Sequence, residues 1–281
     1  MKLRVYSDLL DGCIARVTAS LYAELPEFGT DLAIDASDMP AYANGQRYLS
    51  KNGPERQRYS DPDATSGHRS AVSTRKGGGF YGFRLHAAVC ARTDLPVAWR
   101  VETAASHESN YVASLLDTVK ARGFDPDTCA LDMGYDNNRS TASARSATFA
   151  RSSRSARRPN VKAGKAGPPS CEHGTWRFAG SDSKRGASKW RCPTGECSPA
   201  SRWVAADRLH PLVPRETPRW RKLYKGRAAV EREFGRLKHE WALAPLRVRG
   251  LDRVALHADL TILTKLACAL SRARAVPLAA C

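Results

Sequence analysis

The sequence predicts an α/β protein, and three of its features point to that class. Two short apolar runs, at residues 32–34 and 128–131, are each followed by an aspartate, which is typical of short buried strands. Residues 81–103 contain two further strand-like stretches separated by turn residues. The C-terminal part places apolar residues at helical spacing, so helices should cover a sheet.

Length and charge limit the classes of function. The chain has 281 residues, of which 42% are hydrophobic, so it can bury a sizeable core. Lys and Arg number 45 against 28 Asp and Glu, and the formal net charge of +17 favours a polyanionic partner such as nucleic acid. Because the sequence has neither an apolar run of about 18 residues nor a signal-peptide pattern, we expect a cytoplasmic protein without a membrane partner.

The N-terminal third begins with a predicted helix and a predicted strand. Residues 1–30 form an N-terminal helical segment, because Pro26 and Gly29 would end a helix. The next apolar run predicts a buried strand that ends at Asp35 and presents its carboxylate there. The stretch Asn44–Gly79 is polar and rich in Gly, Ser and basic residues, which predicts an exposed loop.

The central part is predicted to contain three strands and a helix. Tyr81–Ala91 and Pro96–Thr103 should pair as a hairpin across a short polar turn. The stretch His107–Arg122 has apolar residues at helical spacing, which predicts a helix with one core face. Thr128–Leu131 should be a strand that ends at Asp132, in the same arrangement as the first strand.

Residues 139–159 have an unusual composition. They contain only Arg, Ser, Ala, Thr, one Phe and one Pro, which is too little apolar surface to fold. Such proportions are typical of a GC-rich gene read in a wrong frame, so one hypothesis is that two compensating frameshifts replaced a strand of the core. The alternative is a natural basic linker that binds DNA.

The remaining residues complete a five-part organisation. Residues 160–220 contain a Cys/His cluster and predict a compact insertion. Arg221–Trp241 and Asp252–Arg274 should each form one helix. Residues 31–138 and 221–275 would then be the two parts of one core, separated by the atypical segment and the insertion.

Three acidic residues suit a two-metal site for phosphoryl transfer. Such a site needs hard oxygen ligands on rigid elements, which Asp35, Asp132 and the helical Glu231 would supply. Asp38 and Asp136 are competitors, but each is offset from its apolar run. The alternative interpretation is that the aspartates are ordinary turn or cap residues.

The helix that carries Glu231 also carries cations on the same face. At about 100° per residue, Tyr224, Arg227 and Lys238 lie within roughly 40° of Glu231. Glu233 is the competing glutamate, and it points about 200° away from that face. The alternative interpretation is an amphipathic helix with an ordinary salt-bridged surface.

The cysteines cluster in the predicted insertion. Cys171-x-His173 and Cys192-x4-Cys197 form two close pairs about twenty residues apart, which resembles a structural zinc ribbon. The alternative is that reduced cysteines pack beside tryptophans in a small β structure. Both interpretations remain open from the sequence.

The helix pattern resembles a known family signature. The spacing Tyr-x2-Arg-x3-Glu-x6-Lys, which begins at Tyr224, is similar to that of DDE transposases of bacterial insertion sequences. The similarity extends over roughly residues 30–272. Other segments that resemble the family are residues 32–35, 81–86, 105–109 and 131–136.

This resemblance implies a fold and an activity. The fold would be a ribonuclease-H-like mixed sheet flanked by helices, with the Cys/His-containing insertion before the glutamate helix. The protein would cut DNA at insertion-sequence ends and transfer the strand to target DNA, as a homodimer that uses Mg²⁺ or Mn²⁺. The resemblance implies that the catalytic metal ligands are Asp35, Asp132 and Glu231, and that the DNA-binding residues are Tyr224, Arg227 and Lys238.

Two departures from the family leave the activity of this copy open. Relatives usually carry a further N-terminal helical region that binds the element ends, and the residues before Asp35 are too few to form it. The segment 139–159 stands where a helix and a strand are expected, so the chain would be a truncated or decayed copy under the frameshift hypothesis. The alternative functions are a metal-dependent nuclease of the same fold and a non-catalytic basic DNA-binding protein.

Overall fold

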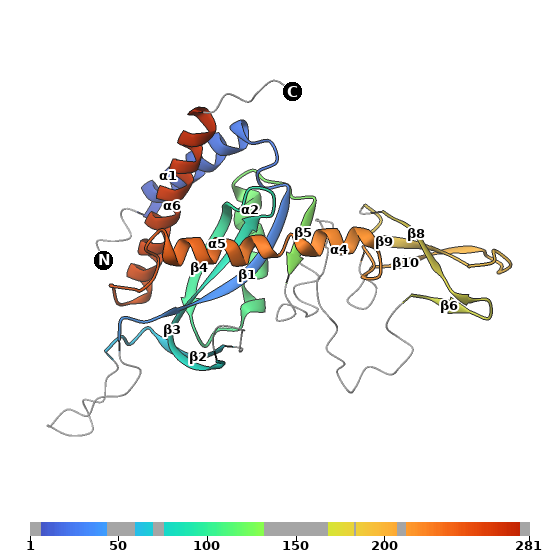
Figure 1. Ribbon diagram of the computed structural model, residues 1–281, viewed down its shortest axis with the longest axis horizontal. Helices are drawn as coiled ribbons and strands as arrows, with labels where there is room; N and C mark the ends of the chain where they lie inside the picture. The colour runs from blue at the N-terminus through green and yellow to red at the C-terminus, as the bar shows by residue number, and fades with distance from the viewer. Residues whose placement is uncertain are drawn as a thin grey trace.

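A mixed five-stranded sheet flanked by helices forms the body of the molecule (Figure 1). The computed structural model describes residues 7–43, 60–69, 76–131, 168–182, 184–206 and 212–275. The strands of the main sheet are β1 (Asp31–Pro40), β2 (Thr65–Arg69), β3 (Gly78–Cys90), β4 (Pro96–Thr103) and β5 (Thr128–Leu131). The helices are α1 (Ser7–Glu24), η3 (Glu108–Asn110), α2 (Val112–Ala121), α4 (Pro218–Lys225), α5 (Ala228–His239) and α6 (Leu251–Ala275).

The long strand β3 organises the sheet. It pairs antiparallel with β1 along one edge, and with β4 and β2 through different parts of its length. The strand β1 in turn pairs parallel with β5. The sheet is therefore mixed, as predicted, and the predicted hairpin of β3 and β4 and the predicted strand β5 are confirmed.

The end predicted for the first strand is wrong. The strand β1 does not stop at Asp35 but continues to Pro40, so Asp35 lies in the middle of the strand. Residues 36–40 lack an apolar run, and their strand conformation comes from backbone pairing with residues 82–86 of β3. Pairing with β3 thus extends the strand β1 beyond its run of apolar residues.

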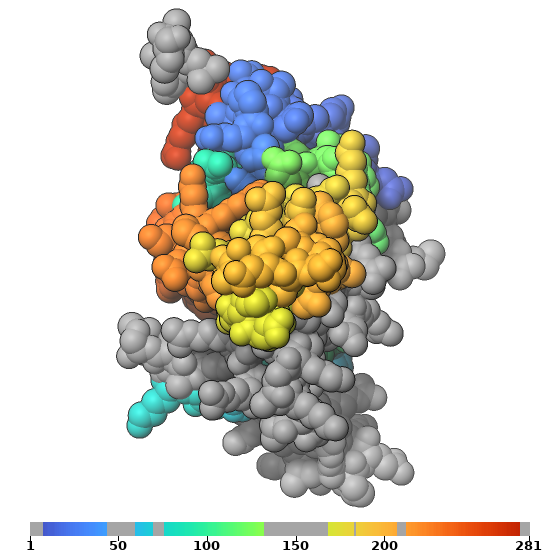
Figure 2. Space-filling view, turned by 90° about the vertical axis from the view of Figure 1, so that its right-hand side faces the viewer, coloured from blue at the N-terminus to red at the C-terminus, as the bar shows by residue number. Residues whose placement is uncertain are grey.

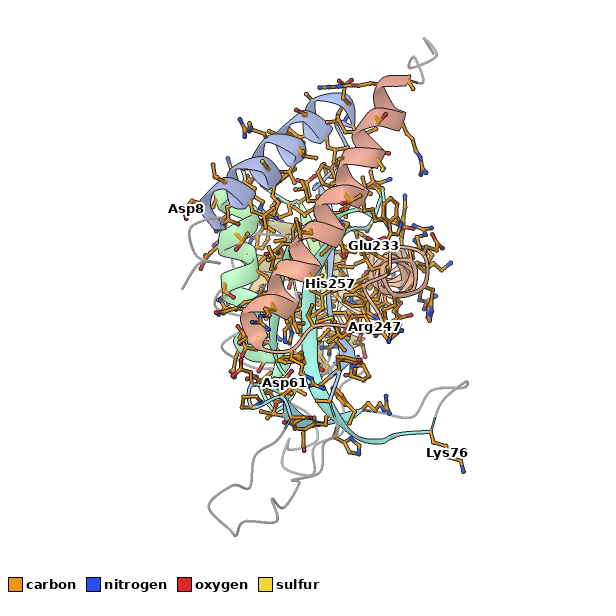
Figure 3. The ribbon with its side chains drawn as sticks, turned by 90° about the vertical axis from the view of Figure 1, so that its left-hand side faces the viewer. Asp8, Asp61, Lys76, Glu233, Arg247 and His257 are labelled. Atoms are coloured by element: carbon orange, nitrogen blue, oxygen red, sulfur yellow. The ribbon has the colours of Figure 1, made fainter. Side chains whose placement is uncertain are left out.

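The stretch predicted as an exposed loop, Asn44–Gly79, contains ordered structure in its described part. The polar strand β2 pairs with β3 there, and Asp61 is fully buried. The carboxylate of Asp61 accepts a hydrogen bond of 3.1 Å from the backbone N–H of Gly250, just before α6 (Figure 3). A hydrophobic pattern does not predict this segment, because its contacts are polar and distant in sequence.

The helices α1 and α6 pack against each other beside the sheet. Ile14 and Leu21 of α1 are buried in the main core. The helix α6 is long and apolar enough to cross a membrane by length and composition alone. Its Lys265 nevertheless forms an ion pair with the buried Glu233, and its Asp259 accepts a hydrogen bond from Trp99, so one face of α6 packs on the main core in this structure.

The helix predicted for Arg221–Trp241 is divided into α4 and α5. Between them the backbone forms short-range bonds, from the N–H of Ala229 to the carbonyl of Gly226 and from Val230 to Arg227. This is the pattern of a 3₁₀ turn, and glycine is a weak helix former at that point. Because Gly226 and Arg227 keep helical dihedral angles, α4 and α5 lie nearly in line (Figure 1).

Residues 168–206, here called the β6–β10 segment, form small sheets at one end of the molecule (Figures 1 and 2). Two short strands pair as a hairpin, and three others form an antiparallel sheet with β9 in its centre. The strands are β6 (Ser170–Cys171), β7 (Gly174–Thr175), β8 (Arg177–Asp182), β9 (Ala187–Arg191) and β10 (Ser201–Ala205). The atypical stretch 139–159 lies outside the described residues.

Candidate active site

One guanidinium group joins two of the predicted acidic residues. Nη1 of Arg227 lies 3.4 Å from Oδ2 of Asp35, and Nη2 of Arg227 lies 2.6 Å from Oε1 of Glu231. The side chain of Asp35 is 17% exposed, whereas that of Glu231 is 55% exposed. The strand β1 and the helix α5 therefore bring together a recessed carboxylate and an accessible one.

The packing of α5 on the sheet accounts for this arrangement. Val230, Phe234 and Leu237 are buried and face the main core, where α5 contacts β1 and β3. Arg227 and Glu231 are four residues apart and lie on the same side of the helix. The apolar stripe fixes the rotation of α5, and this rotation presents the charged face to Asp35.

The other two residues of the predicted signature, Tyr224 and Lys238, lie in α4 and α5. Nζ of Lys238 donates a hydrogen bond of 2.6 Å to the backbone carbonyl of Asp38 in β1. The ring of Tyr224 lies 5.9 Å from Cζ of Arg227 and stacks on Trp220 at 5.0 Å between ring centroids. A cationic and aromatic strip therefore borders the two acids.

The competing acids occupy other environments. The carboxylate of Asp38 contacts Arg84 at 3.4 Å, on the sheet face opposite to Asp35, because side chains three positions apart in a strand point to opposite faces. Glu233 is fully buried between α5 and α6, where it pairs with Lys265 (Figure 3). Burial raises the pKa of Glu233 to about 7, against the opposing effect of the Lys265 ammonium.

An aspartate that the sequence interpretation missed anchors α5 to the sheet. Asp94, in the turn between β3 and β4, binds Arg232 through both carboxylate oxygens at 2.6 and 2.9 Å and Arg236 at 3.0 Å. Burial would raise the pKa of Asp94, but the two guanidinium groups outweigh it and lower that pKa. The i, i+4 spacing of Arg232 and Arg236 indicates that the two arginines lie on one face of the helix, but no residue near them in the sequence identifies Asp94 as their partner.

The third predicted acid, Asp132, lies outside the described residues, as does its competitor Asp136. The strand β5 ends at Leu131, which pairs with Ile34, the residue before Asp35. The C-terminal end of β5 therefore lies next to Asp35 in the sheet.

Three of the four predicted zinc ligands gather in the β6–β10 segment. The sulfur atoms of Cys171, Cys192 and Cys197 all lie within 4.8 Å of one another. The ring of His173 is outside this group, with Nδ1 at 3.3 Å from the Glu196 carboxylate.

The environment of Cys192 favours a thiolate. Burial would raise the pKa of Cys192, but hydrogen bonds from the Thr194 side chain and from the backbone at Cys197, Thr194 and Gly195 lower it to about 5, whereas burial and the neighbouring sulfur atoms raise the pKa of Cys197. A thiolate is the form of cysteine that binds metals.

The chemistry of the acidic site fits a divalent cation. Carboxylate oxygens are the ligands that Mg²⁺ and Mn²⁺ prefer, and those of Asp35 and Glu231 already share one positively charged partner. The accessible position of Glu231 leaves that side of the site open to a large substrate.

Comparison with known proteins gives one match. A family model described as "Transposase DDE domain" matches residues 26–264. No curated protein and no solved structure matches the chain. The match includes β1, β3, β4, β5 and α5, and thus every element that contributes to the acidic site.

Proposed function

Because this chain belongs to the transposase DDE domain family, we propose that it cuts DNA at the ends of an insertion sequence and joins the freed ends to target DNA. The family implies a ribonuclease-H-like core, a divalent metal and DNA as partner, in agreement with the mixed sheet and the net charge of +17. In this proposal Asp35, Asp132 and Glu231 hold the metal.

The observation that carries the proposal is the contact of Arg227 with both Asp35 and Glu231. It links a strand near the N-terminus to a helix near the C-terminus through groups of opposite charge. Since consecutive Cα atoms are about 3.8 Å apart, Asp132 is one residue from the pair Leu131–Ile34, which supports its role as the third ligand.

The side chains suggest a division of roles. A bound pair of divalent cations would supply an activated nucleophile and stabilise the leaving oxygen of a phosphodiester. Asp35, in the middle of β1, would be the rigid ligand, and Glu231, on the exposed side of α5, the adaptable one. Arg227 would exchange its carboxylate partners for a DNA phosphate, to which a guanidinium binds well.

Tyr224 and Lys238 would extend the DNA contact on either side of Glu231. An aromatic ring offers a stacking surface for a base, and a lysine near a phosphate offsets its charge. Strand transfer requires two element ends, so we expect the active form to be a homodimer. The protein would act in the cytoplasm, where bacterial DNA is accessible.

A nicking assay tests this function. Supercoiled plasmid is incubated with the full chain and Mn²⁺, beside the variants Asp35→Asn and Glu231→Gln. Each variant should lose more than about 100-fold of the nicking rate, since even partners of metal ligands change metal affinity or activity by about 10- to 100-fold. The matched control is Glu240→Gln, an exposed glutamate at the end of α5, which should nick normally.

Other outcomes would contradict the proposal in different ways. Unchanged nicking by Glu231→Gln would exclude this carboxylate as a ligand. Metal-dependent nicking without joining of labelled element ends to a target would indicate a nuclease of the same fold. A folded chain that binds DNA equally well with and without Glu231 and never nicks would indicate a non-catalytic DNA-binding protein.

A further inference from the structure

The β6–β10 segment brings three cysteines from two separate places in the sequence to one point. Cys171 ends the short strand β6, and Cys192 and Cys197 flank the turn between β9 and β10. The three sulfur atoms lie within 4.8 Å of one another. All three cysteines are free, so no disulfide accounts for the gathering.

The sulfur spacing is that of metal ligands. Sγ of Cys171 lies 3.8 Å from Sγ of Cys192. A disulfide would require about 2.05 Å. Tetrahedral zinc with Zn–S bonds of about 2.3 Å places two sulfur ligands about 3.8 Å apart. The side chains are therefore already arranged as two corners of such a tetrahedron.

The turn between β9 and β10 supports ligand binding by its backbone. Gly195 has a φ of +83°, a conformation that glycine adopts without strain. The hydroxyl of Thr194 in this turn lies 3.5 Å from the sulfur of Cys192. Hydrogen bonds to a ligand atom orient it and tune a metal site.

The apolar core of this segment is small. In the described residues only Trp176, Trp190 and Cys192 form its buried cluster, with a few partly buried neighbours. The hairpin of β6 and β7 has only two residues in each strand. Small structures of this kind usually need a disulfide or a metal to remain folded.

We propose that Cys171, Cys192 and Cys197 bind one structural zinc ion and that His173 is its fourth ligand. His173 lies in the turn between β6 and β7, two residues after Cys171. Nδ1 of His173 lies 3.3 Å from the carboxylate of Glu196, the residue before Cys197, and Nε2 lies 3.4 Å from that of Glu172. The imidazole thus reaches the turn that carries Cys197, and it would exchange one carboxylate partner for the ion. The ion fastens the β6–β7 hairpin to the β8–β10 sheet, and this role is independent of catalysis at Asp35 and Glu231.

Metal content measured on the full chain tests the zinc site. Native mass spectrometry of protein in excess Mg²⁺ should show one zinc per chain, because Mg²⁺ takes oxygen ligands and does not compete for thiolates. Cys192→Ser and Cys197→Ser should each lose the ion. Cys13→Ser, a partly exposed cysteine in α1, is the matched control and should keep it.

A wild-type measurement protects the test against misfolded variants. Alkylation of the thiols should release the zinc, and a chelator should change the tryptophan fluorescence of the chain reversibly, with recovery on addition of Zn²⁺, because Trp176 and Trp190 pack with Cys192. Reduced wild-type protein that has been stripped of metal by a chelator and then gains no mass with Zn²⁺ would overturn the proposal. Equal zinc content in Cys192→Ser would also overturn it.

The fourth ligand has its own test. Replacement of zinc by Co²⁺ gives visible absorption bands that depend on the ligand set. His173→Ala should shift these bands and weaken metal binding by more than about 100-fold, since even partners of metal ligands change affinity by about 10- to 100-fold. An unchanged cobalt spectrum with unchanged affinity would exclude His173.

Discussion

Nη1 of Arg227 lies 3.4 Å from Oδ2 of Asp35, although the two residues are 192 positions apart in the sequence. The same guanidinium binds Glu231 of its own helix. Two carboxylates that face each other repel unless a cation lies near them, and Arg227 supplies that cation. A divalent metal that uses the same oxygens must share or displace this contact.

Replacement of Arg227 by Gln should therefore separate metal binding from catalysis. Without DNA, Mn²⁺ should bind about two- to fivefold more tightly, a small factor because Glu231 is solvent-exposed and the pair is screened. Plasmid nicking should fall, because the DNA phosphate loses its guanidinium partner. Calorimetric Mn²⁺ titration measures the first effect, with Arg253→Gln, an exposed arginine of α6, as control, and weaker Mn²⁺ binding would show that Arg227 instead positions the ligands.

His86 should make the fold sensitive to acid. It is fully buried on β3, neither ring nitrogen has a hydrogen-bond partner, and its ring lies 4.6 Å from that of Tyr111. Burial, aided by the charges of Arg84 and Arg100, lowers its pKa from 6.5 to about 3. The unfolded chain therefore binds more protons between these two values, and stability that is fully present above about pH 6.5 is lost as the pH falls toward 3.

The variant His86→Phe should remove that dependence. Urea unfolding at pH 7.0, 5.5 and 4.5 should show the wild type losing on the order of 1–3 kcal/mol relative to the variant over this range. At pH 7 the variant should be at least as stable, because two unpaired buried nitrogen atoms are removed. The control is His257→Gln in α6, and parallel pH profiles of wild type and His86→Phe would contradict the prediction.

The buried pair of Glu233 and Lys265 joins α5 to α6. Lys265→Met should destabilise the protein by about 3–5 kcal/mol, because the carboxyl group of Glu233 remains buried without its partner. The double variant Glu233→Leu, Lys265→Met should recover most of that loss, since hydrophobic replacement of a whole buried pair is often neutral. Urea denaturation measures both, and additive losses in the double variant would argue against the coupling.

Gly82 lies where the backbones of β3 and β1 leave no room for a side chain. A Cβ atom there would lie 2.3 Å from the backbone oxygen of Met39, which cannot move without displacing β1. Gly82→Ala should cost about 1–3 kcal/mol, the usual range for overpacking. Gly79→Ala is the matched control, because its Cβ would meet nothing closer than 3.8 Å, and equal thermal stability of the two variants would contradict this account.

Elements with strong local signals could be predicted from the sequence. The strand Thr128–Leu131 and the helix Leu251–Ala275 follow their apolar patterns closely, and the charged face of α5 follows from helical periodicity. The polar strand β2 and the second half of β1 were not predicted. Backbone pairing with β3 holds both in place, and their side chains show no pattern that indicates a strand. The pairing of Asp94 with Arg232 could not be predicted either, because the two residues are 138 positions apart in the sequence.

In the candidate sites, too, contacts between residues close in sequence were predictable and contacts between distant residues were not. Spacing within α5 identified Arg227 and Glu231 as neighbours, but the sequence could not show that the same arginine also reaches Asp35. For the cysteines, proximity in the sequence suggested His173 as an equal member of the cluster. In the structure, its ring instead contacts Glu172 and Glu196.

The chain leaves the main sheet after Leu131 of β5 and returns at α4, which contacts β5. Everything between these two points therefore begins and ends at one place on the core. Segments with adjoining ends can be exchanged, lengthened or cut out with little disturbance to what surrounds them. A short flexible linker that begins after Asp132 and ends before α4 could therefore replace this segment, while Asp35, Asp132 and Glu231 all stay in the chain.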